Sequence, residues 1–197
     1  GGSRWPRFDL VMFPQPTELP PELTSELVTR GVPRTLLGRY RASHELAPIE
    51  VPGFGLLICF GTTGYFGQVC LNPRSGQVVD VMMDRALNHQ AGDRLIPTRI
   101  VRTPRLVNSS LEQFIASVHA VLDRFPFDSE GTGGNIDEDS KLDRPTMEWE
   151  HAANELQETL RLIDPAIEHI DGFWMTFLDD LRIGDFSTSQ VTGISNV

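Results

Sequence analysis

Short apolar runs separated by turn residues in the middle of the chain predict a series of β-strands. Residues 61–64 (Gly-Thr-Thr-Gly) and 72–76 (Asn-Pro-Arg-Ser-Gly) supply the glycine that tight hairpin turns need at positive φ. Pro97 disfavours a central position for the last run, which is therefore expected at a sheet edge. The expected strands are an irregular one over 34–46, three clear ones over 54–60, 64–71 and 77–83, and a short one over 95–101.

The first helix is expected before these strands. A proline-rich, extended segment over 13–21 leads into it. Thr17 is the expected N-terminal cap, because a hydroxyl there can accept a hydrogen bond from the first turn. Gly31 and Pro33 are expected to end the helix, since neither residue continues a helix well.

The strongest helical signal follows the strands. Ser109 and Glu112 have the spacing of a capping box, and Pro126 ends the pattern. The apolar residues between them fall within an arc of about 120° on a helical wheel. This face is therefore expected to lie on the sheet. Its members are Leu111, Phe114, Ile115, Val118, Val121, Leu122 and Phe125.

Two further amphipathic helices are predicted in the last third of the chain. One covers about 146–163, carries Trp149 on its apolar stripe and is broken at Pro165. The other lies within 172–186 and has Trp174 among apolar residues at helical spacing. Both tryptophans are therefore expected to be core residues.

A helix, then strands, then helices predict an α+β fold, a single domain in which helices cover an antiparallel β-sheet. The length of 197 residues suits one domain. The domain is expected over 17–186 and includes an acidic, glycine-rich loop at 128–144. Residues 1–16 are expected to be an extended N-terminal segment, whose first three residues resemble the scar of a removed expression tag, and 187–197 a flexible tail.

Charge is divided unevenly along the chain. Residues 1–127 contain 11 acidic and 13 basic residues, a net charge of +2, whereas 128–197 contain 16 and 4, a net charge of −12. An acidic surface repels nucleic-acid phosphates and attracts basic proteins, so a protein partner is expected and direct nucleic-acid binding is not. A purely solubilising acidic face would have the same composition. The longest apolar run, 54–60, is too short to cross a bilayer, so no membrane partner is expected.

Candidate catalytic and metal-binding residues form no recognised pattern. The segment 128–139 resembles an EF-hand loop in part, with Asp128 first and Gly133 sixth. However, Asn135 stands where an apolar residue is expected, and Asp139 is shorter than the usual final glutamate. The five histidines lack metal-ligand spacing, and no Walker, Rossmann or GxSxG pattern occurs. We therefore predict no enzyme, no metal and no cofactor.

The two cysteines, Cys59 and Cys70, lie in apolar, strand-like stretches. Two cysteines in a chain of this size do not make a disulfide framework. We expect both to be buried free thiols in a reducing cytoplasm, where a cysteine acts as a small apolar side chain.

Three stretches carry a family resemblance. They are the helix that ends at Gly31, the hairpin series FGLLICFGTTGYFGQVCLNPRSGQVVDV at 54–81 and LVNSSLEQFIASVHAVLDRFP at 106–126. The segment 163–186 adds an Asp-Pro step and an aromatic pair. Together they resemble the SUKH superfamily, in particular its fourth immunity-protein branch, over roughly 17–186. The acidic loop departs from the compact link usual between the late helices of that family.

The resemblance implies an α+β fold without catalysis and a role in neutralising a cognate toxin domain of a polymorphic-toxin system. Toxins of such systems include basic nucleases and nucleic-acid deaminases, which an acidic partner suits. The family is too diverse for contact residues to be carried over, so the candidates come from charge alone. They are Asp137, Glu138, Asp139, Glu148 and Glu150. Glu148 has a second possible role, because a carboxylate near a helix N-terminus is stabilised by the helix dipole.

Two other functions stay open at this stage. The chain could be a non-catalytic module that binds or scaffolds a cellular protein, or a hydrolase with an unrecognised site. A toxin gene beside this one would favour the immunity role over a general binding module. A hydrolase would require that changing one polar residue abolishes activity while the fold stays intact.

Overall fold

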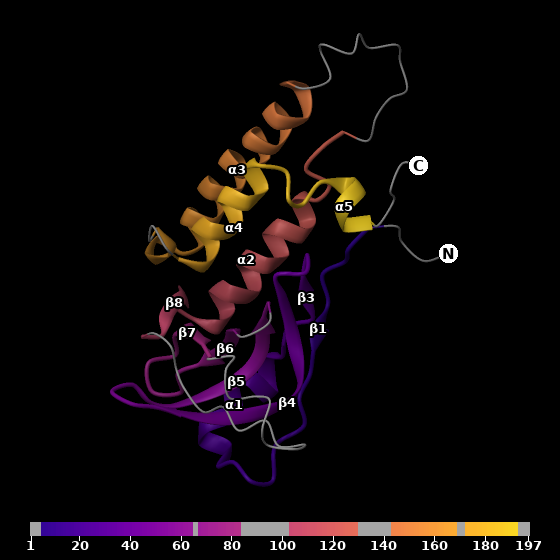
Figure 1. Cartoon of the computed structure of the whole chain (residues 1–197). Helices are drawn as coiled ribbons and strands as arrows, with labels where there is room; N and C mark the ends of the chain where they lie inside the picture. The colour runs from indigo at the N-terminus through magenta and orange to yellow at the C-terminus, as the bar shows by residue number, and fades with distance from the viewer. Residues whose placement is uncertain (1–4, 65–66, 84–102, 130–142, 169–171, 193–197) are drawn as a thin grey trace, which may run out of the picture. The chain divides into compact units, whose positions relative to one another are not determined.

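The predicted α+β domain with an antiparallel sheet is confirmed. The computed structural model describes residues 5–64, 67–83, 103–129, 143–168 and 172–192 (Figure 1). Within the domain, the chain divides into two compact units, each described by itself. The sheet unit is Asp9–Ile115, and the helical unit is Gly1–Phe8 with Ala116–Val197.

The sheet unit is built on six antiparallel strands, β3 to β8, which neighbour one another in chain order. A separate ladder pairs β1 with β2. Gly64 follows β5 at φ 56° and Gly76 precedes β7 at φ 77°, so the predicted hairpin turns use glycine where φ is positive. The strands are β1 (Leu10–Val11), β2 (Val32–Pro33), β3 (Thr35–Leu36), β4 (Tyr40–Val51), β5 (Gly55–Thr63), β6 (Gly67–Leu71), β7 (Val78–Met82) and β8 (Arg105–Asn108).

The strands differ from the prediction mainly at the two ends of the sheet. The irregular strand expected over 34–46 is two strands, β3 and β4, and β4 continues to Val51. The edge strand expected over 95–101 lies outside the described residues. The last strand of the sheet is β8, which the sequence pattern did not indicate, because four residues are too few to establish a two-residue period.

The first helix, α1 (Pro21–Arg30), begins four residues after the expected cap at Thr17, so that prediction is wrong. Pro20 occupies the N-cap position, and Pro21 lies in the first turn. Proline suits that turn because its fixed φ is helical and its missing N–H would have no partner there. Gly31 ends the helix as predicted, at φ 72°.

The second helix, α2 (Leu111–Arg124), is capped one residue later than predicted. The backbone N–H of Gln113 donates to the Ser110 hydroxyl at 3.2 Å. Ser110 and Gln113 therefore take the places that the sequence assigned to Ser109 and Glu112. The same three-residue spacing is present in both pairs, so sequence alone does not decide between them.

The start of α2 packs on the sheet. Phe114 is fully buried, and its ring meets those of Tyr40 and Phe60 edge-on, with centroids 5.3 and 5.8 Å apart. This arrangement is favourable for aromatic rings. It confirms, for the first turn of α2, that the apolar face of this helix lies on the sheet. Burial raises the pKa of Tyr40 far above its ordinary value, so its hydroxyl stays protonated.

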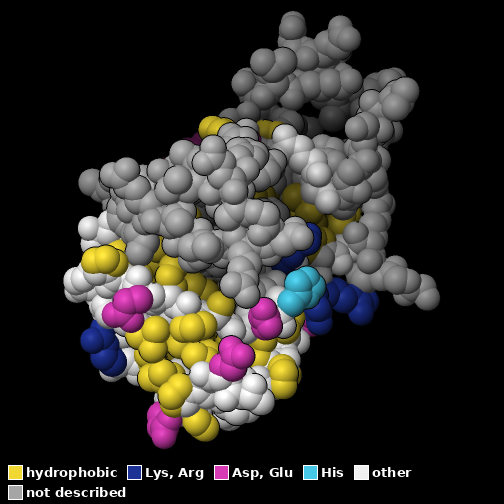
Figure 2. Space-filling view, turned by 60° about the horizontal axis from the view of Figure 1, so that its bottom comes forward, with side chains coloured by type: hydrophobic (Ala, Val, Ile, Leu, Met, Phe, Trp, Pro, Cys, Tyr) yellow, Lys and Arg dark blue, Asp and Glu magenta, His cyan; other side chains and the backbone are white. Residues whose placement is uncertain are grey.

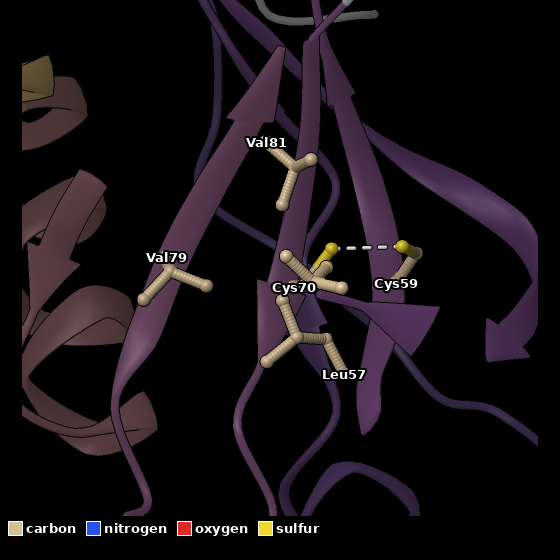
Figure 3. Close-up of a cluster of buried hydrophobic side chains, with 6 residues drawn as sticks. Leu57, Cys59, Cys70, Val79 and Val81 are labelled. Carbon is tan, nitrogen blue, oxygen red and sulfur yellow. Dashed lines mark hydrogen bonds between the residues drawn. The ribbon is translucent and has the colours of Figure 1, made fainter. Parts of the chain in front are cut away.

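The opposite face of β5 contributes to a second buried cluster, because alternate residues of a strand point to opposite faces. No member of this cluster is more than 6 % exposed (Figure 3). In β6 the consecutive residues Val69, Cys70 and Leu71 are all buried, so this strand is covered on both faces. The cluster consists of Val51, Leu57, Cys59, Cys70, Val79 and Val81, with Ile49, Phe54 and Met83 packed against it.

Cys59 and Cys70 are both buried free thiols, as predicted. They are direct register partners across β5 and β6, and their Sγ atoms lie 2.7 Å apart (Figure 3). Burial, together with the hydrogen bond that the two thiols share, raises the pKa of Cys70 well above its ordinary value. The Cys70 thiol therefore remains protonated at neutral pH.

We expect iodoacetamide to label neither cysteine of the folded protein at about pH 8, since only an accessible thiolate is a good nucleophile. In concentrated urea the same reagent should add two carbamidomethyl groups. Mass spectrometry of intact protein over time gives the number of adducts. Rapid double labelling of the folded chain would contradict the burial of this pair.

The helical unit is centred on two helices, α3 (Asp143–Ile163) and α4 (Phe173–Arg182), which pack side by side (Figure 1). The end of α3 is as predicted, and its start lies three residues earlier. A short 3-10 helix, η2 (Pro165–Ile167), follows, and the Asp164 carboxylate caps it by accepting the Ala166 N–H at 3.2 Å. The core includes Ala152, Ala153, Leu156, Leu160, Trp174, Phe177, Leu178 and Leu181.

The two tryptophans of the late helices differ in burial. Trp174 is 1 % exposed, which confirms it as a core residue. Trp149 is only half-buried. Its ring lies against Gly184, where φ is 87° and an added Cβ would collide with the ring. Its Nε1 is buried with no hydrogen-bond partner among the described residues.

Part of the expected C-terminal tail is helical. Residues Thr188–Thr192 form α5, and the backbone N–H of Thr188 donates to the Asp128 carboxylate at 3.1 Å. Asp128, in the segment that follows α2, thus binds the first residue of α5. Among the described helices of the chain, none is both long and apolar enough to cross a membrane.

Candidate partner-binding surfaces

The predicted acidic contact residues fall into two groups. Asp137, Glu138 and Asp139 lie outside the described residues. Glu148 and Glu150 both lie in α3, two positions apart, so they cannot share one helix face. Glu150 is exposed, whereas Glu148 is half-buried.

Glu148 has a structural contact. Its carboxylate accepts the backbone N–H of Ser129 at 2.8 Å and the Ser129 hydroxyl at 2.5 Å. Glu148 thereby connects the segment after α2 to the first turns of α3. This hydrogen-bonding role of the carboxylate competes with a role in partner binding. It differs from the helix-dipole role considered from the sequence, because Glu148 lies in the second turn of α3 and its partner is Ser129.

Several other acidic side chains of the helical unit pair with arginines. Arg124 Nε donates to Glu155 at 2.8 Å and holds the pKa of that carboxyl below its ordinary value. Arg161 lies within 3.7 Å of Glu158 and within 3.6 Å of Glu168. Since the whole unit contains 17 acidic and 7 basic residues, these pairs leave a large excess of negative charge on it.

A second candidate surface is a pocket in the sheet unit, in which the segment before α1 faces β4. The pocket has a volume of about 390 Å³. Two stretches that are distant in sequence, 13–19 and 44–48, provide its walls. The lining residues are Phe13, Pro14, Pro16, Thr17, Glu18, Leu19, His44, Glu45, Leu46 and Pro48.

An irregularity in β4 shapes one wall of this pocket. Ala42 pairs with Gly61 and Ala47 pairs with Cys59, so four residues of β4 stand opposite one residue of β5. Such a bulge bends a strand and re-aims its side chains. Here it places Leu46 inward, 7 % exposed, beside the exposed residues His44 and Glu45.

The pocket combines apolar and acidic groups. Phe13 and Leu46 are buried, while Glu18 and Glu45 are exposed. Of the described residues that line it, none is arginine or lysine. Figure 2 shows the end of the sheet unit that lies lowest in Figure 1. On this face hydrophobic side chains gather, acidic side chains lie among them, and basic side chains stand at the margin.

This pocket was not predicted from the sequence. Its two signals, a proline-rich segment and an irregular strand, were both visible, but nothing local indicates that 13–19 faces 44–48. As for metals, no three His, Cys, Asp or Glu side chains come together as a possible ligand set in the part of the chain that the structure describes.

A family model described as SUKH-4 immunity protein matches residues 3–180 of the chain. The match includes the whole sheet unit, with the pocket, and most of α4. It confirms the family resemblance that the hairpin series and the helix entries carried. No curated protein and no solved structure matches the chain.

Proposed function

The chain belongs to the SUKH-4 immunity protein family, and from this membership we propose that it binds a cognate toxin domain and neutralises it without catalysis. We further propose that the toxin is a basic nuclease or nucleic-acid deaminase of a polymorphic-toxin system and that the complex forms in the cytoplasm. The observation that supports a basic, nucleic-acid-directed toxin is the net charge of −12 on residues 128–197.

Electrostatics supports this choice of partner. An enzyme that acts on nucleic acid needs a basic groove, and acidic side chains can occupy such a groove in place of phosphates. Complementary charge also accelerates encounter and disfavours wrong partners. Fast association matters for an immunity protein, because it must reach the toxin before the toxin reaches its substrate.

The test is to co-express the chain with the toxin domain encoded beside its gene and to titrate purified toxin activity with purified chain. The proposal expects rescued growth and a sharp inhibition endpoint at one chain per toxin. Inhibition by far less than one chain per toxin would mean catalytic inactivation and would favour a hydrolase. Binding of a cellular protein with no effect on the toxin would favour the scaffold alternative.

The predicted contact residues Asp137, Glu138 and Asp139 supply a more specific prediction. Replacing Asp137 and Asp139 with asparagine and Glu138 with serine is expected to slow association with the toxin and to flatten its salt dependence. Exposed charges act mainly on the association rate, over about 8–10 Å at physiological salt. Stopped-flow measurements give the association rate of each protein at low and at high salt.

A matched control removes three acidic charges elsewhere, at Glu22, Glu112 and Asp123, all of them exposed. It has the same net charge as the loop variant, so it separates a local contact from the overall charge. Both variants should melt at nearly the temperature of the parent. Equal association rates for the loop variant and the parent at both salt concentrations would assign the loop a solubilising role only.

A further inference from the structure

We propose that the pocket between residues 13–19 and 44–48 receives a long basic side chain, arginine or lysine, from the bound toxin. This inference rests on the proposed function, because the toxin supplies the side chain. It adds a second contact site, in the sheet unit, to the acidic residues of the last third. It also assigns a role to Glu18 and Glu45, which the charge pattern did not single out.

The size of the pocket suits a single side chain. Pockets that enclose whole small molecules have volumes of about 300–1,000 Å³. The volume here, about 390 Å³, lies near the lower limit of that range. It can take one extended side chain with some water, and it is too small for a helix or a strand of a partner.

The lining specifies the chemistry of that side chain. The apolar parts, Phe13 and Leu46 among them, suit the methylene stem of a long basic residue. Glu18 and Glu45 suit the cationic group at its end, and a charge-assisted hydrogen bond to a carboxylate is among the stronger ones. An acidic side chain would be repelled, and a purely apolar one would desolvate the carboxylates without compensation.

The carboxylates are available for this contact. In the part of the chain that the structure describes, neither Glu18 nor Glu45 has an ion-pair partner. They come from different elements, Glu18 from the segment before α1 and Glu45 from the bulge of β4. Each wall of the pocket thus contributes one carboxylate.

The walls are also pre-organised. Pro14, Pro16 and Pro48 line the pocket, and the fixed φ of proline limits the freedom of both walls. The Gln15 amide donates to the carbonyl of Leu19 at 3.3 Å, and Thr24 in α1 donates to the Gln15 side chain at 3.1 Å. Because these contacts already order the segment, little conformational entropy is lost when a ligand enters.

The variant that tests the pocket is Glu18→Gln with Glu45→Gln, and its matched control is Glu22→Gln with Glu50→Gln. The control residues are exposed, lie in α1 and β4 and do not line the pocket. Both variants change the net charge equally, so long-range attraction falls equally. We expect the affinity for the toxin to fall at least tenfold in the pocket variant, through faster dissociation, and less than threefold in the control.

A probe that needs no toxin separates this inference from the proposed function. Nα-acetyl-arginine methylamide should shift the Leu46 methyl and His44 ring NMR signals saturably in the parent and not in the pocket variant. Nα-acetyl-norleucine methylamide should give no saturable shift. If the parent binds no toxin, the proposed function fails, but the arginine probe still tests whether the pocket binds a basic side chain. If toxin affinity is equal in the pocket and control variants, or if the arginine probe gives no saturable shift, the inference fails and toxin neutralisation stands.

Discussion

Truncating Trp174 to alanine is expected to lower the free energy of unfolding by about 3–5 kcal/mol, the usual range for a large aromatic side chain in a core. Trp174 is 1 % exposed and packs edge-on against Phe173 and Phe177, with ring centroids 4.9 and 6.0 Å away. Removing the indole leaves a cavity in the core of the helical unit, and such cavities close only partly. Urea unfolding followed by circular dichroism measures the change.

Leu162→Ala is the control for this prediction. Leu162 lies in α3, but its side chain is 82 % exposed, so its truncation should change stability by no more than about 0.5 kcal/mol. The stability lost in Trp149→Ala should lie between the losses in Leu162→Ala and Trp174→Ala, because Trp149 is half-buried. An unchanged urea midpoint for Trp174→Ala would show that Trp174 is exposed in solution and free to act as a partner anchor.

Replacing Arg105 with methionine is expected to cost about 3–5 kcal/mol of stability, because it removes a two-pronged cation contact from a buried carboxylate. Asp80 in β7 is only 5 % exposed, and Arg105 in β8 is its register partner. Arg105 Nε and Nη2 donate to the two carboxylate oxygens at 3.1 and 2.7 Å. The two-pronged contact fixes the edge strand β8 to the sheet.

Two comparisons show whether the burial of Asp80 causes the loss of stability in Arg105→Met. Arg34→Met removes a pair of similar length, 2.6 Å to Asp9, in which both side chains are about half exposed. It should cost less than about 1 kcal/mol. The double variant Asp80→Val with Arg105→Met removes both charges of the pair and should recover most of the lost stability. If Arg105→Met and Arg34→Met have equal effects, the Asp80 carboxylate is not dependent on its cation.

Local sequence determined the central hairpins, most of the helices and the charge of this protein. The hairpins around β5, β6 and β7 were predictable because their turns need glycine at positive φ, and α2 because its apolar residues keep a helical period. The acidic last third was also plain from the sequence. Even here the exact cap of α2 was not decided, since Ser109 and Ser110 each have a suitable partner three residues later.

Contacts between distant segments were decided by the tertiary structure alone. The pocket exists because the bulge of β4 and the proline-rich segment before α1 face each other, about 30 residues apart in sequence. Likewise, Asp80 meets Arg105, and Cys59 meets Cys70, only through the register of neighbouring strands. Register is set by the hydrophobic patterns of both strands together with the geometry of their connection, so the residues of one strand do not determine it.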